Sequence, residues 1–293
     1  MISSENFARE FVVSSINKAY EACSEQFYIV KQNFSEESVH DYRVAVRRSL
    51  SLILLLEQVC RLSYAKQIKK LLKAQIKLLN PLRDTQVQLL ELRKSIYTYP
   101  ALFNFYVKKL GDEQIHINNF KNYIDNFDIE EIRALIFFQN LQIKNKTDDA
   151  LPAFSSFFNI SQNTFLEMKE LSGLLSTEEF DTYHKLRLAV KKYRYIVEFL
   201  FEYINYPKSE LKKLKQMQTL LGDIQDSRVY MNELKLFFDA GDPVMLSFYE
   251  APTKAIINKR ILLLEEFQPY LQRITELWQD EFFIFKANEK ISD

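Results

Sequence analysis

The sequence has few of the residues that build tight turns, disulfide frameworks or backbone phosphate cradles. Its 293 residues include 4 glycines and 7 prolines, a poor composition for a sheet protein with many turns. Cys23 and Cys60 lack the spacing of a disulfide framework and are expected to be reduced thiols. The sequence contains no P-loop and no glycine-rich dinucleotide turn, so a phosphate site would have to use side chains and helix N-termini.

The sequence also lacks an excess of charge and a long apolar run. Lys plus Arg and Asp plus Glu number 39 each, so any anion site requires segregation of charge. Apolar residues make up 47% of the chain, which argues against disorder. No run approaches the ~20 apolar residues of a membrane helix, and residues 1–10 do not resemble a signal peptide. These features predict a cytoplasmic, all-α protein without a membrane segment.

One motif occurs twice, as HDYRVAVRR from His40 and as HKLRLAVKK from His184. On a helix, the histidine and the basic residues three and seven positions later lie within ~60° of one another. These residues are His40, Arg43 and Arg47 in the first copy, and His184, Arg187 and Lys191 in the second. An apolar run follows each copy, which is typical of a buried helix. Each motif is therefore interpreted as the basic first part of a helix whose following, apolar part is buried in the core.

The repetition extends over the whole chain. The histidines match at an offset of 144 and the following segments at 142, which a two-residue change in length explains. This period is too long for a solenoid. We therefore predict an internal duplication, with residues 1–146 and 153–293 forming two similar helical halves related by a pseudo-twofold axis. A polar hinge is expected at about residues 145–152.

Periodicity and breaker residues predict the helices of the first half. They are expected at 7–31, at 40–62 after an N-cap at Ser35 or Ser38, at 64–79, at 84–97, at 100–123 and at 130–144. Asn80-Pro81 is expected to end the helix at 64–79, because proline disfavours helix in the residue before it.

A lysine stripe follows each motif. The lysines of one stripe lie within ~60° on a helix. They are Lys66, Lys70, Lys73 and Lys77 in the first half, and Lys208, Lys212 and Lys215 in the second. A solvated helix face is the plain interpretation of one such stripe. Like charges at i,i+4 destabilise a helix, so a stripe of lysines has a cost. Both halves nevertheless keep these lysines, although most other surface positions differ between the halves, and this favours anion binding.

The histidines and acids allow more than one interpretation. A histidine can cap a helix or hydrogen-bond in the core, as expected for His116, but an imidazole among cations should have a lowered pKa until an anion binds. A metal site is not favoured, because cations flank each motif histidine and no ligand cluster has suitable spacing. Asp84 and Asp226 are interpreted as helix caps or as partners of basic side chains. No nucleophile pattern is present, so neither catalytic residues nor cofactors are predicted.

The paired His-x-x-Arg-x-x-x-basic-basic helices, each followed by a lysine helix and a Leu-Leu-turn-Asp segment, resemble the CHAD family (conserved histidine α-helical domain). The resemblance covers about residues 6–285. It implies two four-helix-bundle halves around a central basic cavity that binds inorganic polyphosphate, with phosphate or sulfate as a mimic. It also implies localisation at polyphosphate granules. No catalytic domain of the kind appended to some members is apparent, which favours a stand-alone binder.

The resemblance implies a site with members in both halves. They are His40, Arg43, Arg47, Arg48, Lys66, Lys70, Lys73, Lys77 and Arg83, and His184, Arg187, Lys191, Lys192, Arg194, Lys208, Lys212 and Lys215. The halves differ at three positions, where Leu50 matches Arg194, Gln225 matches Arg83 and Thr219 matches Lys77. An asymmetric site is therefore expected.

Two other functions compete with non-catalytic polyphosphate binding. A phosphatase or phosphotransferase acting on polyphosphate would need a metal-binding carboxylate cluster, which the sequence does not display. Basic stripes also suit RNA, but zero net charge and the absence of a basic tail or an aromatic platform in the motifs weigh against nucleic acid.

Overall fold

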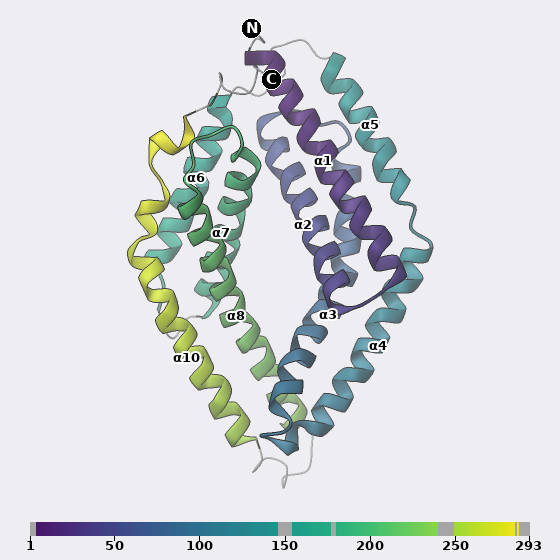
Figure 1. Ribbon diagram of the computed structural model, residues 1–293, viewed down its shortest axis with the longest axis vertical. Helices are drawn as coiled ribbons and strands as arrows, with labels where there is room; N and C mark the ends of the chain where they lie inside the picture. The colour runs from purple at the N-terminus through teal and green to yellow at the C-terminus, as the bar shows by residue number, and fades with distance from the viewer. Residues whose placement is uncertain (1–3, 146–153, 177–179, 240–248, 285, 287–293) are drawn as a thin grey trace. The chain divides into compact units, whose positions relative to one another are not determined.

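The computed structural model describes residues 4–145, 154–176, 180–239, 249–284 and 286, and within these ranges it is helical and contains no β-strand (Figure 1). The prediction of an all-α fold is thereby confirmed for this part of the chain. The chain forms two compact units, Met1–Ala153 (unit 1) and Phe154–Asp293 (unit 2). Most of the hinge expected at 145–152 lies outside the described residues.

Unit 1 is a helical bundle with four sides, of which α1, α2 and α3 each form one. Its elements are α1 (Ser4–Gln32), α2 (Glu36–Val59), α3 (Ala65–Ser95), η1 (Pro100–Leu102), α4 (Phe103–Asp125) and α5 (Ile129–Asn145). Helix α2 packs between α1 and α3, while α4 lies mainly against α3 and α5 mainly against α1 (Figure 1). Helices α4 and α5 therefore form the fourth side of the bundle together.

Unit 2 has a similar order of helices, with the motif helix second. Its elements are α6 (Phe154–Gly173), α7 (Phe180–Leu200), α8 (Lys208–Asp239), α10 (Glu250–Gln272), η3 (Ile274–Leu277) and η4 (Asp280–Phe283). Helix α7, which carries the second motif, packs between α6 and α8, and α10 packs on α8. The buried hydroxyls of Tyr193 and Tyr206 donate to the carbonyl oxygen of Leu277 at 2.9 and 2.8 Å, which holds η3 against the bundle.

Helix α2 begins where its capping residues predict. The Ser35 Oγ accepts the Ser38 backbone N–H at 3.2 Å, and Glu36 and Glu37 lie in the first turn, where acids suit the helix dipole. Residues such as Tyr42 and Val46 are fully buried on the core face. The basic residues of the motif are consequently left on the other side of the helix.

The break predicted at Asn80-Pro81 is wrong, because α3 runs without interruption through Pro81. Proline inside a helix costs about 3 kcal/mol. Leu79 and Leu82 on either side of it are both 0% exposed, and full burial of a leucine contributes about 1.5–3 kcal/mol. Packing of the two leucines thus offsets the proline, and the helices predicted at 64–79 and 84–97 are one.

The second half shows the same departure from the predicted turn. Helix α8 continues through Gly222 and Asp223, with Leu221 and Ile224 each 1% exposed on its core face. The Leu-Leu-turn-Asp segments are therefore helical in both units. Among the helices of the described ranges, none is both long and apolar enough to cross a membrane.

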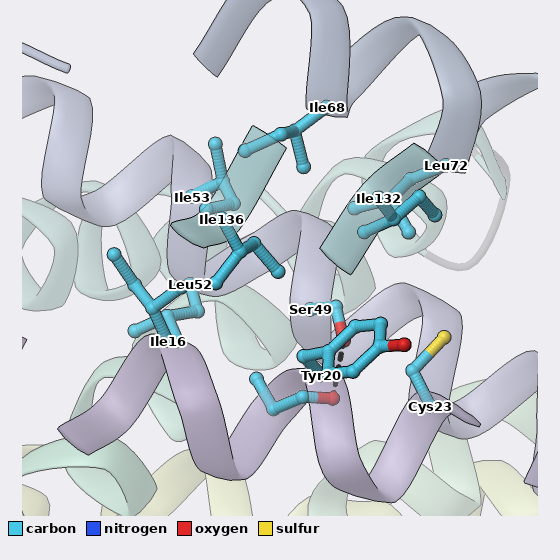
Figure 2. Close-up of a pocket in the computed structure, with 11 residues that line it drawn as sticks. Ile16, Tyr20, Cys23, Ser49, Leu52, Ile53, Ile68, Leu72, Ile132 and Ile136 are labelled. Carbon is cyan, nitrogen blue, oxygen red and sulfur yellow. Dashed lines mark hydrogen bonds between the residues drawn. The ribbon is translucent and has the colours of Figure 1, made fainter. Parts of the chain in front are cut away.

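A small cavity of about 20 Å³ lies in the core of unit 1 (Figure 2). Its lining is almost wholly apolar and includes Ile16, Leu52 and Ile136, together with the thiol of Cys23. The Ser49 hydroxyl lies within hydrogen-bond distance of two backbone carbonyl oxygens, that of Ala19 at 3.1 Å and that of Ala45 at 3.0 Å. The residues that line it include no Lys, Arg or His, so this cavity is not the basic anion site that the motifs predict.

Candidate functional site

Helix α2 presents the first motif on one half-buried face. His40, Arg43 and Arg47 are neither buried nor fully exposed. The side-chain oxygen of Asn80 on α3 accepts from Arg43 Nε at 3.0 Å and from Arg47 Nη2 at 2.9 Å. Because one oxygen receives both guanidinium groups, their orientation is fixed before any ligand arrives.

A second contact between α3 and α2 lies at the start of the motif. Arg83 on α3 forms an ion pair with the Glu36 carboxylate and contacts the Glu36 carbonyl oxygen at 3.4 Å. The pKa of His40 is lowered, first by burial and next by the charge of Arg83, with a smaller effect of Arg43. Asp41 and Glu36 oppose this shift. An anion arriving at this face would raise the pKa again.

The lysine stripe of α3 adjoins the motif face. Lys66, Lys70, Lys73 and Lys77 are all exposed. Asn80 follows Lys77 by three residues and therefore lies within ~60° of it on the helix. The stripe thus leads directly to the asparagine that holds the two arginines of α2.

Helix α7 presents the second motif, but its surroundings differ. Gly222 stands beneath Arg187, where a Cβ on the glycine would lie 3.9 Å from Arg187 Nε. The buried Arg187 Nε makes no hydrogen bond within the described part of the chain, unlike Arg43 Nε, whereas the histidine Nδ1 atoms of both motifs are alike in making none there. Gly222 is the sequence equivalent of Asn80 at the offset of 142. The second unit therefore lacks the amide that orients the first pair of arginines.

The C-terminal end of the α7 face contains an acid. Arg194 is 8% exposed and donates from Nη1 to Glu198 Oε1 at 3.1 Å, while its guanidinium lies 4.7 Å from the ring centroid of Tyr195. The Lys215 Nζ of α8 lies 3.6 Å from the same carboxylate oxygen. The Nζ of Lys191 lies 5.5 Å from the centroid of the same Tyr195 ring. A single carboxylate thus neutralises two of the expected ligand-binding cations.

Other expected site residues are placed less closely around the histidines. Arg48 and Lys192 are exposed and lie ~80° around their helices from His40 and His184. Lys192 pairs with Glu167 of α6 at 3.1 Å, so it is drawn toward that helix. The exposed Lys208 and Lys212 share a face of α8 with Lys215.

Sequence reasoning places neither Asn80 nor Glu198 in the site, and it does not indicate Glu36 as the partner of Arg83. It predicts a helix break at Asn80, whose two partners lie 37 and 33 residues away, so no local pattern indicates them. Glu198 could have been found, because it follows Arg194 by four residues, the spacing of helical ion pairs.

The prediction that Asp84 and Asp226 cap helices is wrong. Both are exposed residues inside continuous helices, Asp84 in α3 and Asp226 in α8. Their alternative interpretation, as partners of basic side chains, stays a prediction. Within the ranges that the structure describes, no group of three or more His, Cys, Asp or Glu is placed to hold a metal ion.

The sequence profile of the CHAD domain matches residues 15–116 and 142–235, which is more than half of the chain. The chain belongs to the CHAD family. Two solved structures are similar to this CHAD protein in fold. The first is the CHAD domain from the plant Ricinus communis, with a TM-score of 0.68 and 18% sequence identity. Its alignment covers 92% of this chain and 90% of the Ricinus chain. The second is PptA from Streptomyces chartreusis, with a TM-score of 0.69 and 9% sequence identity. Its alignment covers 90% of this chain and 99% of the PptA chain. A search of curated protein sequences found no match.

Proposed function

We propose that this CHAD protein binds inorganic polyphosphate on the basic faces of its motif and lysine helices, without chemistry of its own. The observation that carries the proposal is the anchoring of Arg43 and Arg47 on one Asn80 oxygen, beside four exposed lysines of α3. Two oriented guanidinium groups next to a row of mobile ammonium groups suit a ligand that repeats one anionic group many times.

The chemistry of the ligand explains the division of labour. Polyphosphate is a flexible chain with about one charge per phosphate, and cations one helical turn (~5.4 Å) apart can engage successive groups. Arginine fixes phosphate oxygens in bidentate geometry, whereas lysine acts as an adaptable point charge. Release of counterions should supply much of the affinity, so the affinity should fall steeply with salt. A salt slope near zero contradicts the proposal.

The test removes the motif cations and measures the affinity for long-chain polyphosphate. The variant R43A/R47A/R187A/K191A should lose most of its binding, by about 100-fold or more, because charge-assisted contacts to phosphate are each worth about 1.5–3 kcal/mol. The matched control removes four exposed lysines from other helices. It is K121A/K144A/K169A/K254A, which has the same change in charge and should bind nearly as the wild type does.

Separate variants of each unit divide the effect. R43A/R47A and R187A/K191A should each weaken binding partially. Circular dichroism and thermal melting establish that the helices persist, since the arginines of unit 1 also hold Asn80. Binding that survives the fourfold variant would place the site elsewhere on the protein.

Two measurements test the competing functions. Competition between polyphosphate and single-stranded RNA at matched charge should favour polyphosphate, and preference for RNA would indicate a nucleic-acid protein. Incubation with polyphosphate and magnesium should release no orthophosphate, whereas release would indicate a phosphatase or phosphotransferase. Polyphosphate binding would also draw the protein to polyphosphate granules, which microscopy of the tagged protein can test.

A further inference from the structure

We infer that Glu198 is an internal competitor of the ligand, which occupies Arg194 and Lys215 and so makes unit 2 select long polyanions over short ones. The inference rests on the proposed function, because it concerns the ligand preference of the same basic face. Its basis is that a carboxylate of α7 already takes the position of an anion between two of the cations.

The geometry places this carboxylate within the binding face. Counted along α7, His184, Arg187, Lys191, Arg194 and Glu198 fall within ~80° of one another. Glu198 lies seven residues beyond Lys191, about 10.5 Å along the helix axis. The row of cations therefore ends on an acid.

The contacts show how firmly the acid is held. The side chains of Arg194 and Glu198 are 10% and 16% exposed, and their atoms lie 3.1 Å apart. Lys215, at 3.6 Å from the same oxygen, has a side chain that is 52% exposed. Glu198 is thus fixed by the sheltered arginine, while the lysine can turn to solvent or to a ligand. The lysine is the cation that a phosphate chain can recruit first.

Unit 1 has no acid at the equivalent positions of this face, and the acid near this end of α2, Glu57, pairs with Lys69 outside the stripe. At the offset of 144, Leu50 and Leu54 are the equivalents of Arg194 and Glu198. Lys73 of α3 is the equivalent of Lys215 at the offset of 142 and is exposed. The residue equivalent to the carboxylate partner of Lys215 is therefore a leucine in unit 1.

The consequence for specificity follows from competition within one molecule. A short anion that contacts Lys215 must displace Glu198 with few other contacts to compensate. A long chain held at Arg187 and Lys191 presents its next phosphates to Lys215 at high effective concentration. The carboxylate therefore weakens short ligands more than long ones.

The experiment compares Glu198→Gln with Glu276→Gln, using tripolyphosphate and long-chain polyphosphate in calorimetric titrations. Glu276 is a matched control in the same unit, because it also joins two cations, Lys213 at 3.3 Å and Arg273 at 3.5 Å. E198Q should bind tripolyphosphate about tenfold more tightly and long chains about threefold more tightly than the wild type. It should also steepen the salt dependence by one or two released ions. E276Q should change neither affinity by more than about twofold.

A pair of lysine variants tests the same inference without disturbing a sheltered ion pair. Lys215→Gln should leave tripolyphosphate binding almost unchanged, because Glu198 already occupies that lysine, whereas Lys73→Gln should weaken it about threefold. In the E198Q background, K215Q should remove most of the gain. Equal losses from K215Q and K73Q, or equal affinities of E198Q and E276Q, overturn the inference.

The outcomes separate the inference from the function on which it rests. A wild-type protein that fails to bind long-chain polyphosphate at low salt overturns both. A wild-type protein that binds it with a steep salt dependence, while E198Q shows the wild-type ratio of long-chain to tripolyphosphate affinity, overturns the inference alone. Tighter binding by E198Q at unchanged salt slope also contradicts release of the two cations.

Discussion

The two motif helices carry nearly the same cations but hold them in different ways. In unit 1, Asn80 accepts from both Arg43 and Arg47. In unit 2, the equivalent of Asn80 is Gly222, and Arg187 Nε lies buried above it without a hydrogen bond in the described part of the chain. The first site is therefore pre-organised by a neutral amide, whereas the second leaves its central arginine to be oriented by a ligand.

The two sites also differ in which basic residues their acids pair with. Unit 1 pairs Glu36 with Arg83 at the start of α2, next to His40. Unit 2 pairs Glu198 with Arg194 near the end of α7. Each motif helix also has an ion pair at its other end, Glu57 with Lys69 in unit 1 and Asp181 with Arg228 in unit 2. The difference is that Glu198 lies close to two of the expected ligand-binding cations, whereas Glu57 pairs with a lysine outside the stripe. A basic motif alone therefore does not determine affinity, because the groups that hold each cation decide how much of its charge is available.

The largest expected effect comes from copying the leucines of unit 1 into unit 2. Arg194→Leu removes the sheltered partner of Glu198, so the free energy of unfolding should fall by about 3 kcal/mol. Adding Glu198→Leu should recover most of this loss, because a hydrophobic pair can replace a buried ion pair at little cost. Urea unfolding of the full chain measures both. A double variant less stable than R194L would show that the pair is not the source of the effect.

A smaller effect is expected from exchanging the residues beneath the arginines. Gly222→Asn supplies the amide that Arg187 lacks, and its Cβ fits, since the nearest atom is at 3.9 Å. The pre-oriented arginine should tighten polyphosphate binding about threefold, and Asn80→Ala should weaken it by a similar factor. Gly222→Ala is the control, because it adds a Cβ without an acceptor. Equal affinities of G222N and G222A would remove pre-organisation as the difference between the sites.

The smallest effect concerns pH. Because the folded state lowers the pKa of His40, its contribution to stability is present above the unfolded pKa of ~6.5 and is lost as the pH falls through the folded value. His40→Asn should therefore reduce the loss of stability between pH 7.5 and pH 5.5. Bound polyphosphate should raise the pKa of His40, so the affinity of the wild type should increase as the pH falls, and less so in H40N.

Thermal unfolding and titrations across this range provide the measurement. His184→Asn, made alongside, shows whether unit 2 shares the dependence. An affinity of H40N that follows the wild type at every pH would separate His40 from the ligand.

Much of the fold was predictable because local signals and packing agree. The cap at Ser35 and the apolar positions of α2 predicted where the motif helix begins and which face it buries. The breaks expected at Pro81 and Gly222 failed because buried leucines and isoleucine on both sides stabilise a continuous helix. Local propensity was overridden by tertiary packing, which the sequence displays only through residues far along the chain.

The site was predictable in its cations and not in their partners. Helical spacing places His40, Arg43 and Arg47 on one face, and the structure leaves all three on the same half-buried side of α2. The contact with Asn80 depends on the register of α2 against α3, which periodicity alone does not fix. The role of Glu198 depends likewise on its approach to Lys215 of the next helix.

The cavity beside Cys23 gives the protein an internal reporter. Burial raises the pKa of the Cys23 thiol to about 12, so the thiolate that alkylating reagents attack forms only when the surrounding core opens. Cys60 is half-buried, and no cysteine occurs in the sequence of unit 2. The rate of thiol modification in the unaltered chain therefore measures the opening of one half of the duplication while the other half stays silent.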